Sequence, residues 1–144
     1  MRVLVQRCSN AKCIVNNKIV NEIDKGLMLL VGFTLDDNKE TIEKMVNKII
    51  NLRIFPDESG VMNKSVQNVK ESILSISQFT LYADTSKGNR PSYIKAMKGA
   101  KASLLYEYFN KRLNDYVPCK GGIFGADMEI SFTNLGPTTI MLER

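Results

Sequence analysis

Histidine is absent from this sequence of 144 residues. Without imidazole, the chain has no Ser-His-Asp or Cys-His nucleophile, no imidazole general base and no histidine-ligated metal. Any catalysis must therefore come from hydroxyl groups, amides, backbone N–H groups, lysine, tyrosine or carboxylates, or from the substrate itself. We accordingly expect a protein that uses no metal and no cofactor.

Cysteine is scarce, and long apolar runs are absent. The three cysteines, Cys8, Cys13 and Cys119, form no CxxC pair, which predicts reduced and mostly buried thiols in a cytosolic protein. No apolar run approaches the ~20 residues of a membrane span. The segment from Met1 to Arg7 has neither the apolar region nor the small-residue cleavage site of a secretory signal. We therefore expect a cytoplasmic protein with no membrane contact.

The length and charge of the chain narrow the possibilities further. Residues 1–144 are most simply one domain. A chain of this size buries roughly 68–70% of its unfolded surface, so it needs no disulfide or metal for stability. Lysine and arginine outnumber aspartate and glutamate by 20 to 15, which gives a net charge of +5. This excess is compatible with an anionic partner such as nucleic acid, without proving one.

Two segments have the apolar spacing of amphipathic helices. In the first, Asp37 and Glu40 have the spacing of a capping box with Asp37 at the N-cap, followed by a predicted buried stripe of Ile42, Met45, Val46, Ile49 and Ile50. The stripe of the second comprises Ala102, Leu105, Tyr106, Phe109 and Leu113. Lys98 and Lys101 would lie near this stripe, so we begin the second helix near Gly99 rather than further upstream.

The remaining apolar segments predict strands. Residues 2–8 alternate, and residues 12–23 predict a hairpin around Asn16-Asn17, because asparagine tolerates the positive φ of tight turns. After a break at Lys25-Gly26, the continuous apolar run 27–33 predicts a central strand buried on both faces. Further predicted segments are a polar loop at 57–67, a strand at 73–79, a strand at 129–133, a turn at 134–137 and a strand at 138–142.

Together these elements predict an α/β fold. We expect a single domain in which mixed, mostly antiparallel β-sheets form a barrel-like, layered structure. The two principal helices should pack on one side of it. No internal repeat or linker interrupts the chain.

The end of the predicted strand at 73–79 overlaps the segment Ser77-Gln78-Phe79-Thr80. This segment has three hydrogen-bonding side chains, those of Ser77, Gln78 and Thr80. If the strand alternates throughout, Ser77 and Phe79 share one face while Gln78 and Thr80 share the other. The polar side chains are either solvated on a half-exposed strand, or they lie at a strand end that offers hydroxyl groups and an amide to a substrate. The strand pattern by itself favours the solvated, half-exposed strand, and the rest of the chain must decide.

Two further clusters have both a structural and a functional interpretation. Five cations occur between Asp84 and Glu107 with no acid among them, which fits either solvated surface or phosphate contact: Lys87, Arg90, Lys95, Lys98 and Lys101. Gly121-Gly122-x-x-Gly125 is a weak nucleotide fingerprint, because it lacks both GxGxxG and the Lys-Ser/Thr ending and leads into a strand. It leaves open a tight bend at which a ligand approaches the backbone.

Two motifs together resemble the signature of one family. Ser77-Gln78-Phe79-Thr80 and Asn134-x-Gly136-Pro137-x-Thr139 are similar to the motif pair of D-aminoacyl-tRNA deacylases, also called D-tyrosyl-tRNA deacylases. Thr138 departs from the pattern, since an apolar residue is more usual there. Four further segments resemble the family in order along the chain: residues 1–7, 53–63, 87–92 and 122–128.

The resemblance implies a site shared between the two subunits of a homodimer. Gly136-Pro137 of one subunit, with a cis peptide bond and held by Arg7, would insert into the pocket of the other and reject L-aminoacyl groups. The substrate would be the 3′ acceptor end of D-aminoacyl-tRNA. Ser77, Gln78, Phe79 and Thr80 would be the catalytic residues at the ester, and the terminal adenosine and tRNA would be bound by Ala102, Phe124, Met128, Lys87 and Arg90.

Ester hydrolysis agrees with the missing histidine. An aminoacyl ester is already activated, so its hydrolysis needs orientation and oxyanion stabilisation more than a strong nucleophile. Backbone N–H groups near Phe79 and Thr80 are suited to bind the oxyanion, and we predict attack by water, assisted by the 2′-hydroxyl of the terminal ribose, rather than by Thr80. Glycine has no side chain to reject, so glycyl-tRNA should be hydrolysed as well. Two alternatives stay open: a non-catalytic RNA-binding module and a hydrolase of some small ester.

Overall fold

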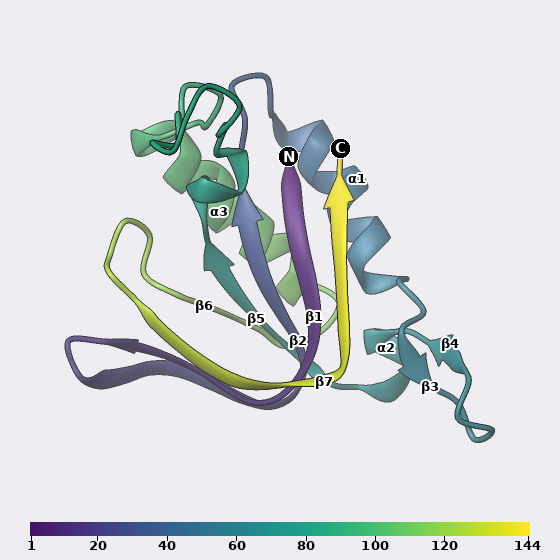
Figure 1. Ribbon diagram of the computed structural model, residues 1–144. Coiled ribbons are helices and arrows are strands. Elements are labelled where there is room, and N and C mark those ends of the chain that lie inside the picture. The colour runs from purple at the N-terminus through teal and green to yellow at the C-terminus, as the bar shows by residue number, and fades with distance from the viewer.

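The computed structural model describes residues 1–144, which form a five-stranded mixed sheet and a small two-stranded sheet (Figure 1). The strand order of the large sheet is β6-β5-β2-β1-β7. Its strands are β1 (Arg2–Val15), β2 (Lys18–Gly32), β5 (Ser72–Ser77), β6 (Cys119–Gly121) and β7 (Glu129–Glu143). β1 pairs antiparallel with β2 and β7, whereas β5 pairs parallel with β2 and β6. The sheet is therefore mixed, as predicted.

Two helices, α1 (Lys39–Ile50) and α3 (Gly99–Asn114), cover one face of the large sheet (Figure 1). Their predicted apolar stripes are buried and share one core of 24 residues with inward side chains of β1 and β2. The α/β class and the position of both helices on one side are confirmed. The sheet does not close on itself, so the fold is layered rather than a barrel. None of the helices is long and apolar enough to cross a membrane.

β2 is the central strand and is buried on both faces, as its continuous apolar sequence predicted. Leu27, Leu29 and Val31 face the helices. Met28 lies in a second cluster on the opposite face, with Cys8, Cys13, Leu74 and Ile76 among its members. This double burial holds the carboxyl end of β2 firmly beside that of β5.

β1 and β2 form one hairpin that is longer than predicted. The turn at Asn16-Asn17 is confirmed, with φ values of 50° and 61°. The break predicted at Lys25-Gly26 is wrong, because β2 continues through Gly26. A Cβ at Gly26 would lie 1.8 Å from the backbone oxygen of Ser72. Glycine is required there because β5 approaches closely, and not because the chain turns.

The first turn of α1 is capped by a residue other than the one predicted. Asn38, and not Asp37, is the N-cap, and its side chain accepts hydrogen bonds from the first turn of the helix. The buried Asp37 carboxylate instead accepts from the Met1 ammonium group at 2.8 Å and from the Thr34 N–H at 2.7 Å. The predicted N-cap is therefore wrong by one residue, and the predicted pairing of Asp37 with Glu40 does not cap the helix.

The segment predicted as a polar loop at 57–67 contains regular structure. Residues 57–61 connect the two strands of a small β-hairpin, β3 (Phe55–Pro56) and β4 (Met62–Lys64). A short helix, α2 (Val66–Val69), follows. Ser65 and Asn68 form a capping box at the start of α2. The polar side chains that suggested a loop thus include the cap of a helix.

β7 is one strand and not two. The turn predicted at 134–137 is wrong, because β1 pairs with β7 on both sides of it. Within this ladder Arg7 alone lies opposite residues 135–138. The extra residues form a bulge on the edge strand, with Gly136 and Pro137 exposed. We refer to residues 135–138 as the Gly-Pro bulge.

Candidate active site

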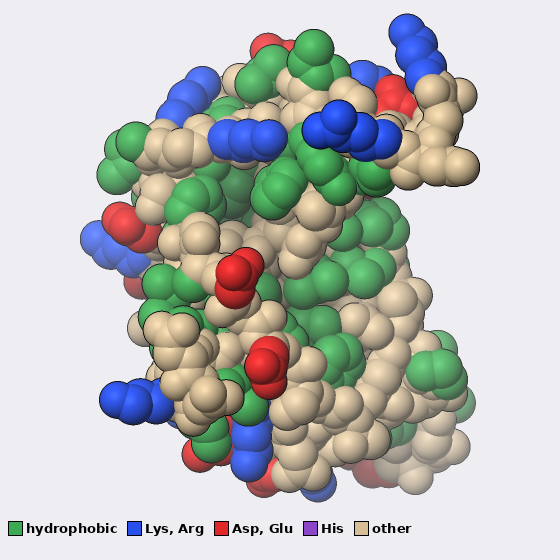
Figure 2. Space-filling model, turned by 60° about the vertical axis from the view of Figure 1, so that its left-hand side comes forward, with side chains coloured by type: hydrophobic (Ala, Val, Ile, Leu, Met, Phe, Trp, Pro, Cys, Tyr) green, Lys and Arg blue, Asp and Glu red, His purple; other side chains and the backbone are tan.

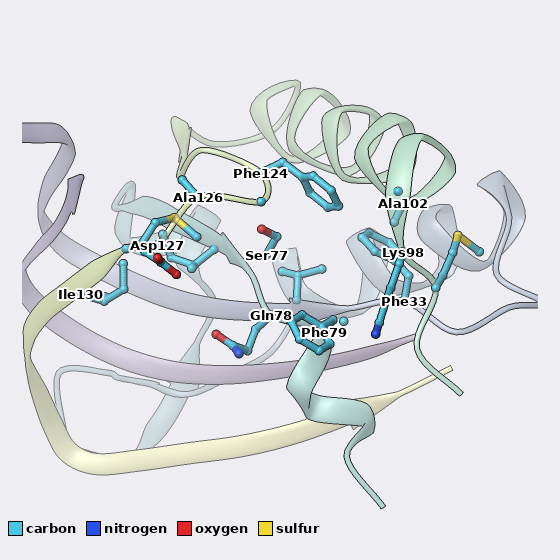
Figure 3. A pocket seen from close by; sticks show the side chains of 17 residues that line it. Phe33, Ser77, Gln78, Phe79, Lys98, Ala102, Phe124, Ala126, Asp127 and Ile130 are labelled. Atoms are coloured by element: carbon cyan, nitrogen blue, oxygen red, sulfur yellow. The ribbon is translucent and has the colours of Figure 1, made fainter. Parts of the chain in front are cut away.

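A cavity of about 390 Å³ opens at one end of the large sheet, beside the first turn of α3 (Figure 3). Its mostly hydrophobic lining comes from the end of β2, the end of β5 with the residues that follow, the start of α3, and the loop between β6 and β7. β2 and β5 run parallel, so their carboxyl ends meet at the same edge. Open α/β sheets commonly bind their ligands at such an edge.

The end of β5 supplies Ser77, Gln78 and Phe79 to the cavity wall, but Thr80 does not line it. β5 ends at Ser77, and the 3-10 helix η1 (Phe79–Tyr82) follows. The strand alternation predicted through Thr80 is therefore wrong. Because η1 begins at Phe79, the N–H groups of Phe79 and Thr80 have no acceptor within that helix. Two backbone donors at the start of η1 thus need a partner from outside that helix.

The hydroxyl of Thr80 is not activated in this structure. It accepts a hydrogen bond from the side-chain amide of Gln78. No carboxylate, lysine or tyrosine is hydrogen-bonded to it or to the hydroxyl of Ser77, so no general base is in place at either. No three Asp, Glu or Cys side chains cluster in a way that would hold a metal ion.

The three residues implied as adenosine-binding all line the same cavity: Ala102, Phe124 and Met128. Ala102 is buried on α3, whereas Phe124 and Met128 come from the segment before β7 and are half-buried. Figure 3 shows Phe124 and Ala102 on the same side of the cavity, above Ser77. The fold therefore brings this apolar set and the end of β5 around one space.

Tyr106 fixes the loop that carries Phe124. Its hydroxyl donates to the backbone oxygen of Ser75 at 2.6 Å and accepts from the N–H of Gly122 at 3.1 Å. Its ring packs against that of Phe124, with 6.0 Å between the centroids. Burial raises the pKa of Tyr106, so the hydroxyl keeps its proton and continues to donate. The helical pattern predicted Tyr106 only as a core residue, although a buried tyrosine hydroxyl usually has a hydrogen-bond partner.

The Gly-Pro bulge does not contribute to the cavity of its own chain. Its Gly136–Pro137 peptide bond is cis. The hydroxyl of Thr139 donates to the Pro137 oxygen at 3.2 Å and accepts from the Asn134 amide at 2.9 Å. Asn134 and Thr139, the first and last residues of the motif, therefore stabilise the bulge from both sides.

Arg7 lies beside the Gly-Pro bulge. One nitrogen of its guanidinium donates to the backbone oxygen of Ile54 at 2.7 Å. A Cβ at Gly136 would lie 3.0 Å from the other terminal nitrogen, Nη2. Arg7 thus connects the bulge to the segment that follows α1.

Lys87 and Arg90 lie outside the cavity. Both are exposed on the loop between η1 and α3, and neither contributes to the cavity lining. Among the five cations of this basic stretch, only Lys98 lines the cavity. It occupies the N-cap position of α3, which begins at Gly99 as predicted. Lys98 was not among the site residues predicted from the sequence.

The fold and the cavity define a small α/β protein with a site suited to binding and orienting an activated ester. A family model described as D-Tyr-tRNA(Tyr) deacylase matches residues 4–143. A solved structure described as c-Myc DNA Unwinding Element Binding Protein is 40% identical, with a TM-score of 0.95, and the match covers 100% of this chain and 99% of that chain. Another, described as a probable eukaryotic D-amino acid tRNA deacylase, is 20% identical, with a TM-score of 0.82 over 98% of this chain and 97% of that one.

The chain belongs to the D-Tyr-tRNA(Tyr) deacylase family. It is accordingly a D-aminoacyl-tRNA deacylase, an enzyme that hydrolyses a carboxylic ester. The family suggested by the two sequence motifs is confirmed. The likeness to the second solved structure shows the fold alone, because the identity is low.

Proposed function

We propose that the enzyme releases a free D-amino acid from the 3′ acceptor end of tRNA by direct attack of water. The ester carbonyl would lie at the start of η1, where the N–H groups of Phe79 and Thr80 would stabilise the oxyanion. The 2′-hydroxyl of the terminal ribose would assist the attacking water. Two observations carry this proposal: Ser77, Gln78 and Phe79 lie in the cavity wall, and no base is hydrogen-bonded to the hydroxyl of Ser77 or Thr80.

The same cavity would hold the terminal adenosine. Ala102, Phe124 and Met128 offer an apolar wall for a flat base. A volume of about 390 Å³ lies near the lower end of the roughly 300–1,000 Å³ range of small-ligand sites. We propose that only the terminal aminoacyl-nucleoside enters, and that the rest of the tRNA stays outside.

A basic surface above the cavity supports contact with the tRNA body. Figure 2 shows Lys and Arg side chains gathered on the upper part of one face, at the height where Figure 1 shows the loop between η1 and α3. Lys87 and Arg90 are exposed on this loop. We propose that both bind backbone phosphates, which would make tRNA binding depend on salt.

We propose that the active form is a homodimer with its sites at the subunit interface. The Gly-Pro bulge is exposed and lies outside its own cavity, so it is available to enter the cavity of a second copy. Hydrophobic side chains are also exposed down the middle of the face shown in Figure 2. A two-fold interface would place two such bulges in two cavities. Analytical ultracentrifugation tests this, and a monomer with full selectivity would contradict it.

In this dimer the Gly-Pro bulge would reject L-aminoacyl groups. The side chain of an L-aminoacyl group would meet the Gly136 and Pro137 carbonyls, whereas the D-form would direct its side chain away. Such a clash separates two substrates more strongly than one methylene group, which contributes only ~1–3 kcal/mol. Glycine offers no side chain to reject, so glycyl-tRNA should also be hydrolysed. We expect the enzyme to act in the cytoplasm, where charged tRNA is used.

One assay tests the activity and its selectivity. Purified enzyme is incubated with D-aminoacyl-, L-aminoacyl- and glycyl-tRNA, with and without EDTA, and release of the amino acid is measured. We expect release from the D- and glycyl-forms, unaffected by EDTA, and retention of the L-form. Comparable hydrolysis of the L-form would contradict the chiral filter. Salt-dependent RNA binding without any turnover would favour the alternative of a non-catalytic RNA-binding module.

A further inference from the structure

Lys98 is the one cation in the wall of the catalytic cavity. Its ammonium group lies 5.0 Å from the centroid of the Phe79 ring and 5.6 Å from that of Tyr93. The two rings contact each other edge to face, with 5.0 Å between their centroids. A cation over the face of an aromatic ring is attracted by the negative charge of that face. The two contacts therefore favour positions of the ammonium group over these rings.

The charge of Lys98 is not neutralised by the protein. Lys98 forms no salt bridge, although seven ion pairs occur elsewhere in the chain. Asp127, the other charged residue of the lining, comes from the segment before β7, and Figure 3 shows it on the opposite side of the cavity. The cavity thus has a positive side at α3 and a negative side at β7.

This asymmetry matches the substrate in one orientation. Lys98 and Ala102 are four residues apart at the start of α3, so they lie on the same side of that helix. Lys98 and Phe79 are both exposed, which places them at the mouth of the cavity. A nucleoside packed against Ala102 with its 5′ side at the mouth of the cavity, where the chain of the tRNA must leave, would bring that side close to Lys98.

We propose that Lys98 binds the phosphodiester that joins the terminal adenosine to the preceding nucleotide. Lysine binds phosphate as a point charge with three donors, so the ammonium group can keep contact with the two rings while it donates to phosphate oxygens. Through this contact the enzyme distinguishes aminoacyl-tRNA from small aminoacyl esters that lack the phosphate. This inference rests on the proposed adenosine site.

Two synthetic esters isolate the phosphate. The first is the D-tyrosyl ester of adenosine, and the second is the D-tyrosyl ester of adenosine 5′-(methyl phosphate), whose single negative charge matches a phosphodiester. The wild-type enzyme should prefer the second by about tenfold in kcat/KM, a size typical of a charge-assisted hydrogen bond. The difference should lie mainly in KM. Lys98→Gln should reduce this preference to about one, and Lys98→Arg should retain it.

Lys101→Gln is the matched control. Lys101 lies one turn further along α3, and its ammonium group contacts the backbone oxygen of Leu35 outside the cavity. It should keep the wild-type preference. With D-aminoacyl-tRNA as substrate, Lys98→Gln should also reduce the slope of log(kcat/KM) against log salt by about 0.7, the value for one phosphate of a single strand.

The outcomes separate this inference from the proposed function. If Lys98→Gln slows both esters by the same factor, Lys98 acts only by supporting Phe79 and Tyr93, and the inference is wrong. It is equally wrong if the wild-type enzyme hydrolyses charged tRNA but treats both esters alike. If the wild-type enzyme hydrolyses neither charged tRNA nor either ester, the proposed function fails and the inference fails with it.

Discussion

Replacing Gly136 with alanine should weaken chiral selection without unfolding the protein. Gly136 has φ of +115°, a region in which a side chain costs about 1–3 kcal/mol. The new Cβ would lie 2.6 Å from the Thr138 hydroxyl oxygen and 2.9 Å from the Thr138 backbone nitrogen. The hydroxyl can rotate away, but the nitrogen moves only with the backbone. The Gly-Pro bulge must therefore shift as a whole.

The strain sets the expected loss of selectivity. If the bulge relieves about 1–3 kcal/mol by leaving its position, the fraction of molecules in the selective geometry falls by roughly 5- to 150-fold, at 1.4 kcal/mol per tenfold. The ratio of D- to L-aminoacyl-tRNA hydrolysis should fall by about the same factor. Because the bulge is exposed on an edge strand, the loss of stability should not exceed the same 1–3 kcal/mol or so.

The assay compares single-turnover rates on D- and L-aminoacyl-tRNA, together with a thermal melt that confirms folding. Gly88→Ala is the matched control, because Gly88 has a similar φ of +127° and nothing lies within 4 Å of its Cβ position. This variant should keep the wild-type ratio despite comparable backbone strain. A folded Gly136→Ala enzyme with an unchanged D-to-L ratio would refute the reasoning.

Three further predictions follow from the site and its supports. Thr80→Ala should keep kcat/KM within about tenfold of the wild type, since only a hydrogen bond to Gln78 is lost; a loss of about 10⁴-fold or more, with a trapped acyl-enzyme, would instead make Thr80 the nucleophile. Tyr106→Phe should lose about 1–3 kcal/mol of stability and lower Tm by roughly 3–10 °C, while KM rises and the D-to-L ratio stays constant; an unchanged Tm in calorimetry would contradict the bracing role. Burial raises the pKa of both Cys8 and Cys119 to about 12, so the folded chain keeps protons that the unfolded chain releases near pH 9, and stability should fall as the pH rises above about 9; a Cys8→Ala/Cys119→Ala variant should show a shallower decline in Tm between pH 8 and 10, and an equal decline would count against this cause.

The parts of the fold predicted correctly are those governed by local patterns. The stripes of α1 and α3 are set by residues three and four apart, and both are buried as expected. Asn16-Asn17 carries its turn preference in its own backbone. The apolar run at 27–33 needs two covered faces wherever the strand lies. Each of these signals is independent of how distant segments meet.

The errors arise where distant backbone decides the conformation. Lys25-Gly26 resembles a turn in composition, but glycine is required at position 26 because the backbone of Ser72 approaches closely. The switch from β5 to η1 after Ser77 leaves no trace in polarity, and it changes which side chains reach the cavity. Near Gly136, the chain bulges instead of turning because β1 continues alongside it.

The site was predictable in its motifs but not in its geometry. Residue patterns alone favoured a solvated strand for the polar side chains at 77–80, and only the family resemblance favoured a substrate site. The five cations of the basic stretch look equivalent in sequence. Only the folding of the loop before α3 places Lys98 in the cavity and leaves Lys87 and Arg90 on the surface.

The Gly-Pro bulge also has a consequence for the open edge of the large sheet. β7 forms one edge of the large sheet, and a long unpaired edge is a template for adding further strands. Pro137 has no N–H to donate, and residues 135–138 interrupt the register of the edge. A foreign strand cannot form an unbroken ladder along β7. The segment proposed to select the substrate therefore also limits the growth of this sheet into fibrils.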